Sequence, residues 1–133
     1  MNKATERSQG PALSPAAYKP EGIHLMLELG GCSEELLRDR AALELALTGS
    51  ARRAGVEVVE SHLHRFEPHG LSGVIIIAQS HIAIHTWPEV GYASIDIYTC
   101  GDAEAAEKIR CELLEVFKPD REETRRTARR PPN

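Results

Sequence analysis

Apolar and polar positions follow a regular order through the middle of the chain. The segment IHLMLEL, residues 23–29, is apolar enough for a buried or half-buried strand and stops at two glycines. Ser33 then provides an N-cap, and the two glutamates after it suit the first turn of a helix. Leucines recur from there to about Ala54, and Gly55 ends the helical pattern. The pattern predicts a strand followed by one long helix.

Further strand patterns come next, and an amphipathic helix over residues 105–117 closes the series. The strand segments are residues 56–66, residues 74–87 with an interruption near Gln79, and residues 92–99. Turn signals rich in Gly and Pro separate them, and links this short join antiparallel strands. The sequence therefore predicts an α+β fold, a two-layer sandwich in which a mainly antiparallel sheet is packed by two main helices.

The two ends of the chain differ from this middle part. Residues 1–21 combine polar residues with three prolines and show little periodicity, so we expect a flexible N-terminal lead-in. Residues 119–133 carry five arginines and end near two prolines, so we expect a basic, flexible tail. One domain over residues 22–118 remains.

Composition narrows the class of protein. With 133 residues, 41% hydrophobic and 27% charged, the chain has the make-up of a soluble globular domain. The net charge of -4 argues against nucleic acid as a partner. The longest apolar run, residues 74–78, is far shorter than the ~20 residues that span a bilayer, and the polar start lacks the apolar region of a signal peptide. We therefore expect a cytoplasmic protein with no membrane contact.

The densest group of reactive side chains follows Gln79. In a strand His81 and His85 share one face, while Ile82 and Ile84 point to the core. Two imidazoles can share a metal ion, although no compelling third ligand is near in the sequence. A polar face exposed to solvent accounts for the pair better than a metal site does.

Ser80 next to a histidine suggests nucleophilic catalysis, since a serine hydroxyl needs a nearby base to lose its proton. No G-x-S-x-G elbow surrounds it, which weakens the hydrolase alternative. The three cysteines have no C-x-x-C spacing, so neither a disulfide framework nor a zinc knuckle is indicated. Residue patterns alone leave these alternatives open.

One longer string is specific. Residues 70–102, GLSGVIIIAQSHIAIHTWPEVGYASIDIYTCGD, resemble the bacterial and archaeal S-adenosylmethionine decarboxylase proenzymes, whose signature reads approximately G-V-S-G-x-x-x-x-x-E-S-H-x-x-I-H-T-W-P-E, followed by a strand that ends in T-C-G. The likeness extends upstream through GIHLMLELGGCSEELL and RFEPHG and covers roughly residues 22–118.

The resemblance implies a zymogen that cleaves itself between residues 79 and 80. The hydroxyl of Ser80 attacks the carbonyl of Gln79, and the serine ends as a pyruvoyl group that forms a Schiff base with the substrate. His85 matches the family's proton acceptor for processing, and Ser72 matches a serine that assists it. The implied cofactor is this pyruvoyl group, with no metal and no external cofactor.

Five further positions complete the comparison with the family's active site. Cys100 matches the catalytic proton donor, and a thiol is mostly protonated at neutral pH. Phe66 and Glu89 match substrate contacts, stacking on adenine and binding the ribose hydroxyls, and we add Trp87 as a substrate contact with a core position as its alternative. Gln79 departs from the family, which usually has glutamate there.

By resemblance, the chain decarboxylates S-adenosylmethionine, releasing CO2 and supplying decarboxylated S-adenosylmethionine for spermidine and other polyamines. The implied assembly is a dimer of protomers, each made of a processed α and β chain. Two alternatives remain. A pyruvoyl-dependent arginine or ornithine decarboxylase would keep the same chemistry. A noncatalytic partner subunit would have no need to retain Ser80, His85 and Cys100 together.

Overall fold

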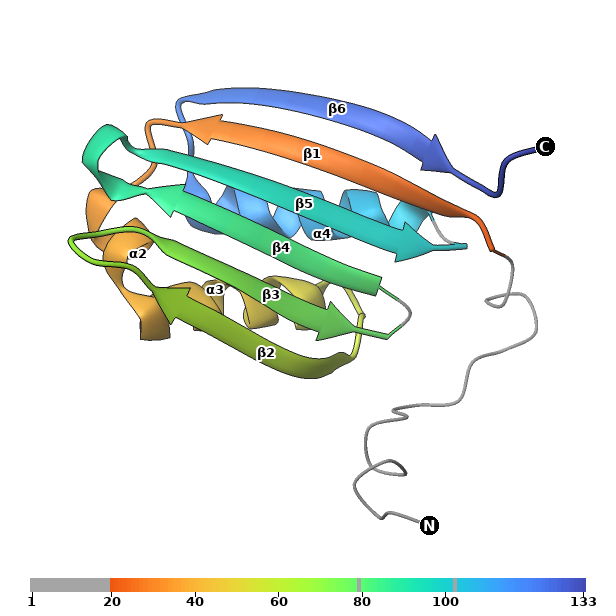
Figure 1. Ribbon diagram of the computed structural model, residues 1–133, viewed down its shortest axis with the longest axis horizontal. Helices are drawn as coiled ribbons and strands as arrows, with labels where there is room; N and C mark the ends of the chain where they lie inside the picture. The colour runs from red at the N-terminus through yellow and green to blue at the C-terminus, as the bar shows by residue number, and fades with distance from the viewer. Residues whose placement is uncertain (1–19, 79, 102) are drawn as a thin grey trace, which may run out of the picture.

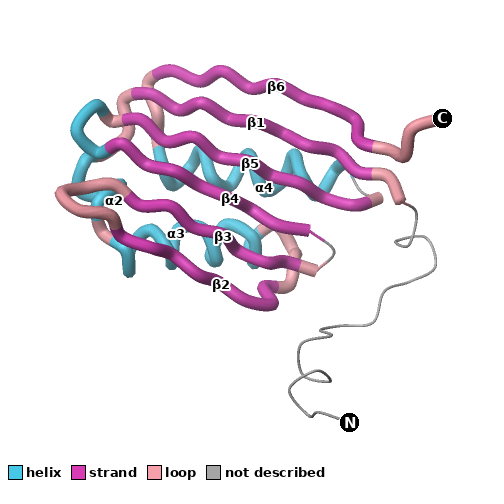
Figure 2. Tube along the Cα trace, viewed as in Figure 1, coloured by secondary structure: helices cyan, strands magenta, loops and turns pink. Residues whose placement is uncertain are grey.

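The computed structural model describes residues 20–78, 80–101 and 103–133. Within these ranges six antiparallel strands form one sheet in the order β2-β3-β4-β5-β1-β6, and the helices lie on one side of it (Figures 1 and 2). The elements are β1 (Gly22–Gly30), α2 (Glu34–Arg38), α3 (Arg40–Arg53), β2 (Val58–Arg65), β3 (Leu71–Ile77), β4 (Ser80–Trp87), the 3₁₀ helix η2 (Pro88–Val90), β5 (Tyr92–Cys100), α4 (Ala103–Phe117) and β6 (Arg121–Arg129). The α+β sandwich predicted from the sequence is confirmed. Gln79 and most of the expected N-terminal lead-in lie outside the described residues.

The core lies between the sheet and the helices because each central strand alternates. Leu25, Leu27 and Leu29 of β1 are at most 2% exposed, and Ile82 and Ile84 of β4 are fully buried. The side chains between them point to the other face of the sheet, which no described helix covers (Figure 1). One face therefore makes the core, and the other presents polar and apolar side chains outward.

The first helical stretch is two helices, not the single helix expected. Asp39 has extended backbone angles, φ -97° and ψ 105°, and ends α2. Its carboxylate accepts the backbone N–H of Ala42 at 3.0 Å and so caps α3. Asp39 suits an N-cap and lies between Leu37 and Leu43, so the recurring leucines hid the break between the two helices. No helix in the described ranges is long and apolar enough to cross a membrane.

The prediction of a flexible tail over residues 119–133 was wrong for most of that segment. Arg121–Arg129 form β6, which pairs with β1 along nine residues and makes one edge of the sheet (Figure 2). All nine residues are exposed and only one, Ala128, is apolar, so the strand has no apolar alternation for sequence analysis to detect. The domain therefore continues past residue 118. The basic side chains are solvated, as expected, but on an ordered strand.

Candidate active site

The candidate residues gather at two opposite ends of the sheet. We call Ser80 and Cys100 the Ser80 group, and the second set the His85 group, which comprises Phe66, Ser72, His85, Trp87 and Glu89. Strand β4 joins the groups, because it begins at Ser80 and ends at Trp87 (Figure 1).

In the Ser80 group, two neighbouring strands end side by side. Ser80 opens β4 and Cys100 closes β5. The backbone N–H of Cys100 donates to Ser80 Oγ at 2.8 Å. Both residues line a hollow of about 300 Å³, and Cys100 is a half-buried free thiol. The contact holds the serine oxygen in a fixed place beside the backbone of Cys100, a residue whose thiol can donate a proton.

In the His85 group, a hydrogen bond crosses from β3 to β4. Ser72 and His85 are direct partners in the register, and Ser72 Oγ lies 2.7 Å from His85 Nδ1. When the ring hydrogen is on Nδ1, the ring donates to Ser72 and leaves Nε2 to accept a proton. This pair can orient a general base.

The rest of the His85 group forms a pocket around that pair. The pocket has a volume of about 330 Å³ and is lined by Phe66, Pro68, His69, Gly70, Leu71, Ser72, His85, Thr86, Trp87 and Glu89. Phe66 is 48% exposed and Trp87 41%, so both offer a ring face to a ligand and Trp87 is not a core residue. Glu89 lies 3.3 Å from His69 through Oε2 and Nε2, which keeps its carboxylate at the rim. Volume and lining fit a small-molecule site.

One chain does not bring the two groups together. Five residues of strand separate Ser80 from His85, a distance of about 16 Å at the usual rise per residue. An odd spacing also places their side chains on opposite faces. The proton acceptor expected from the sequence therefore lies out of reach of Ser80 in the same chain.

Another polar cluster, on the uncovered face, was not expected. His24 Nε2 lies 3.4 Å from Asp96 Oδ1, His81 packs edge-on against Tyr98, and the guanidinium of Arg129 lies over the Tyr98 ring. Burial, followed by the charge of His24, lowers the pKa of His81 despite the opposing effect of Asp96. The sequence does not reveal the contact between His24 and Asp96, because β1 and β5 are neighbours only in the folded sheet.

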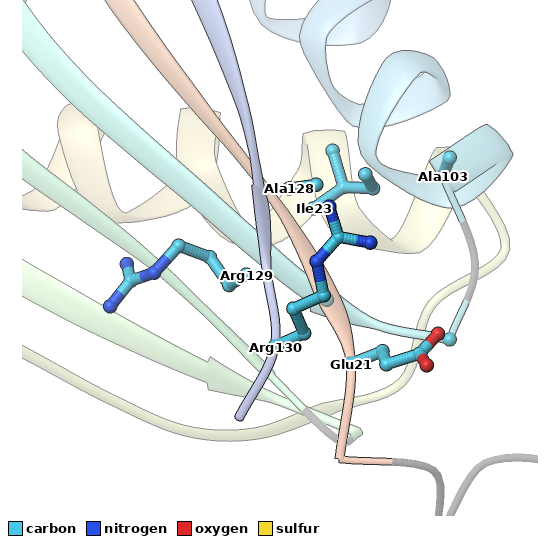
Figure 3. A pocket seen from close by; sticks show the side chains of 8 residues that line it. Glu21, Ile23, Ala103, Ala128, Arg129 and Arg130 are labelled. Atoms are coloured by element: carbon cyan, nitrogen blue, oxygen red, sulfur yellow. The ribbon is translucent and has the colours of Figure 1, made fainter. Parts of the chain in front are cut away.

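Two further observations concern metal binding and a second hollow. No three His, Cys, Asp or Glu side chains gather to hold a metal ion in the described part of the chain. A separate hollow of about 180 Å³ lies near Gly101 (Figure 3), smaller than the ~300 Å³ at which ligand pockets begin. Its labelled lining is Glu21, Ile23, Ala103, Ala128, Arg129 and Arg130, none of which is a candidate residue.

Comparison with known proteins points in one direction. The family model described as S-adenosylmethionine decarboxylase matches residues 23–130. An S-adenosylmethionine decarboxylase proenzyme of Caldicellulosiruptor saccharolyticus is 49% identical over 81 residues, covering 61% of this chain and 65% of that protein. A proenzyme of the same name from Prochlorococcus marinus is 47% identical over 93 residues, covering 70% of this chain and 74% of that one.

A solved structure shows the same similarity in three dimensions. The adenosylmethionine decarboxylase of Aquifex aeolicus superposes with a TM-score of 0.79 at 32% identity, covering 86% of this chain and 95% of the other. The match to the Caldicellulosiruptor relative spans just under two thirds of its length.

Proposed function

Because this chain belongs to the S-adenosylmethionine decarboxylase family, we propose that it is a self-processing, pyruvoyl-dependent decarboxylase that acts on S-adenosylmethionine. Its products are CO2 and decarboxylated S-adenosylmethionine, which supplies spermidine and other polyamines. The observation that carries the proposal is the contact between Ser80 Oγ and the backbone N–H of Cys100, since the two residues with central roles meet at one point.

Processing begins at Ser80 in this proposal. Its hydroxyl oxygen attacks the main-chain carbonyl carbon of Gln79, the C–N bond between the two residues breaks, and an ester replaces the amide. A base removes the Cα proton of Ser80, and the carboxylate of Gln79 leaves. Water then hydrolyses the imine form of the remaining dehydroalanine, which releases ammonia and gives the pyruvoyl group. Gln79 contributes its main-chain carbonyl, so the family's usual glutamate is not required at that position.

The position of Ser80 fits a pyruvoyl precursor. Its oxygen accepts a backbone N–H and its side chain borders a hollow, so a small carbonyl group can replace it without displacing core residues. The pyruvoyl group supplies an electron sink when the substrate loses CO2. Cys100 then delivers a proton to the substrate carbon, as its position beside Ser80 supports.

We propose that His85 of a second copy serves Ser80. A two-fold axis between two facing sheets, perpendicular to their strands, reverses strand direction and sets the Ser80 end of one sheet over the His85 end of the other. Ser80 is the first residue of β4, so in this proposal the second copy reaches it around the end of the strand, although its side chain alternates toward the helices. The uncovered face suits such a contact because it mixes polar groups with Met26, Val74, Ile76 and Ala83, of which Ile76 is 39% exposed. Each complete site then draws on two chains.

The same arrangement brings the pocket of the His85 group to the substrate. Phe66 offers a flat face for adenine, and Glu89 can accept two hydrogen bonds from ribose hydroxyls. Trp87 stacks on Tyr92 with ring centroids 4.9 Å apart, which holds its ring as one wall. Ser72 keeps the His85 ring in place.

The test combines mass spectrometry with an assay of CO2 release. Purified protein should contain fragments 1–79 and 80–133, the second blocked by pyruvoyl, whereas Ser80→Ala should remain intact and inactive. S-adenosylmethionine, arginine and ornithine are then offered separately. An active protein consisting of intact chain overturns self-processing. Preference for arginine or ornithine would favour the amino-acid decarboxylase alternative. Absence of both cleavage and activity would favour the noncatalytic subunit.

A further inference from the structure

We infer that β6 pairs with β6 of another copy of this chain, antiparallel, about a two-fold axis at Thr124. The contact joins two sheets edge to edge. It involves neither the Ser80 group nor the His85 group, and it is separate from the face-to-face contact proposed for the active site.

The first support is the open edge of the sheet. β6 is the outermost strand on its side, and no other described strand pairs with its outer edge. It runs for nine residues without a proline or a recorded bulge. The opposite edge strand, β2, has a register shift between Val58 and Glu60, which is one way proteins discourage strand addition. β6 has no such irregularity.

The second support is the direction of its backbone groups. Gly101 donates its backbone N–H to the carbonyl of Glu21 at 3.1 Å, which fixes the alternation of hydrogen-bonded pairs between β1 and β5. Odd-numbered residues of β1 bond to β5, so even-numbered residues of β1 bond to β6. Their partners in β6 are odd-numbered, and the N–H and C=O groups of even-numbered β6 residues therefore point outward. Glu122, Thr124 and Arg126 therefore present groups to a new strand, and a two-fold axis at Thr124 pairs these even positions with one another.

The third support is the order of charges in REETRRTAR. With the axis at Thr124, Glu122 lies opposite Arg126 of the second copy, and Glu123 lies opposite Arg125 of the second copy. Symmetry repeats both pairs, giving four attractive pairs of opposite charge.

The neighbouring registers lack this complementarity. An axis at Arg125 sets that residue against its own copy and Arg121 against Arg129, so every charged pair is repulsive. An axis at Glu123 sets that residue against its own copy and Arg121 against Arg125. Side-chain charge therefore selects the register centred on Thr124.

The charges around Glu123 within one chain also favour pairing with β6 of a second copy. Glu123 lies directly opposite Glu28 of β1 on the uncovered face, and like charges in that position are destabilising. In the described residues neither Glu123, Arg125 nor Arg126 forms an ion pair. Arg125 of the second copy would lie beside Glu123 and offset its repulsion from Glu28.

The contact has a definite shape and strength. An axis perpendicular to the sheet keeps both helical layers on the same side and makes one continuous sheet from the two copies. A single pair of exposed strands buries less area than a stable interface needs. We therefore expect an association that depends on protein concentration and weakens as salt increases.

Disulfide trapping tests the register directly. Thr124→Cys, in a Cys111→Ser background that removes the exposed native thiol, should form a covalent dimer under a mild thiol oxidant. The paired Cα atoms would lie about 5.5 Å apart, within disulfide range. Arg125→Cys and Arg126→Cys in the same background are the matched controls and should cross-link far less. No cross-link at residue 124, or equal cross-linking at all three positions, overturns the inference.

Sedimentation of the full chain over a concentration series tests the charges. Glu123→Arg should weaken the association on the order of tenfold, because two attractive pairs become repulsive. The double variant Glu123→Arg/Arg125→Glu should recover it, since each pair again has opposite charges. Glu115→Arg, on the exposed surface of α4, changes net charge equally and should leave the association unchanged. Equal masses for the wild type and Glu123→Arg at every concentration, or no recovery in the double variant, contradicts the inference.

Discussion

Cys100 and Ser80 are in contact, yet the proposed mechanism gives them separate tasks. Ser80 becomes the pyruvoyl group, and Cys100 donates a proton only during turnover. Cys100→Ala should therefore still cleave while losing about 10²- to 10⁴-fold in decarboxylation rate, the usual effect of removing a general acid. Mass spectrometry and CO2 release on the same sample separate the two steps. Full activity in the cleaved variant would show that another group donates the proton.

Phe66 tests substrate recognition, because its half-exposed ring belongs to the proposed binding pocket. Phe66→Ala should weaken S-adenosylmethionine binding by about 1 to 3 kcal/mol, the range for a base stacked on an aromatic ring. Self-cleavage should not change. Phe66→Tyr is the matched control, since it keeps the ring. An unchanged kcat/KM for S-adenosylmethionine in cleaved Phe66→Ala would remove adenine stacking from the mechanism.

Cys32 and Cys111 should differ in reactivity. Burial, with a smaller effect from Asp120, raises the pKa of the Cys32 thiol to about 11, while Cys111 is exposed. The reactive thiolate of Cys32 should be scarce at pH 8 and appear only as the pH approaches that pKa. Alkylation with iodoacetamide, followed by peptide mass spectrometry, should label Cys111 first. Faster labelling of Cys32 would contradict the buried position.

The sequence supplies the candidate site residues, but it could not predict their arrangement. The family string proposes Ser80, His85 and Cys100, and the pairing of β3 with β4 places Ser72 opposite His85. Spacing of five residues looked close along the chain, whereas in a strand it means about 16 Å and opposite faces. The sequence of one chain contains no direct signal for a site completed by two chains, as proposed here.

Strand β6 shows where prediction of elements fails. β1, β4, β5 and α4 have strong periodicity because one face of each is buried. β6 buries neither face, and what orders it is backbone pairing with β1 and a contact with α4 that no local pattern reveals. In that contact the Arg110 guanidinium lies 2.6 Å from Glu122 Oε2.

The Arg110–Glu122 pair should stabilise the docking of β6. Burial acts to raise the pKa of Glu122, but hydrogen bonds from Thr124 and Arg110 and the charge of Arg110 outweigh it, so that the pKa lies below its usual value. The stabilisation is fully present above the usual pKa of a glutamate and is lost as pH falls through the lowered pKa. Arg110→Ala should cost up to about 1 kcal/mol of unfolding free energy at pH 7.

Chemical denaturation at several pH values measures this effect. The difference between wild type and Arg110→Ala should shrink in acid, since the protonated Glu122 no longer attracts a guanidinium. Arg52→Ala is the control, because Arg52 is exposed and forms no ion pair in the described part of the structure. A difference that stays constant from pH 7 into acid would show that the ion pair does not contribute.

At the scale of the whole molecule, one sheet has one face covered by helices and one face open (Figure 1). The two halves of the candidate site lie at opposite ends of that sheet, the Ser80 group at one end and the His85 group at the other. In the proposed dimer, a facing copy with reversed strands supplies what each half lacks. The central claim is therefore that His85 of one chain processes Ser80 of another.

Co-expression of two inactive variants tests that claim most directly. Ser80→Ala has an intact His85, and His85→Ala has an intact Ser80, so a mixed pair contains one complete site only if the site forms between chains. We predict that the His85→Ala chain, uncleaved when expressed alone, is cut between residues 79 and 80 when the Ser80→Ala chain is present, and that CO2 release from S-adenosylmethionine appears with it. A His85→Ala chain that remains intact in the mixed pair, or one that is cleaved normally on its own, would contradict the claim.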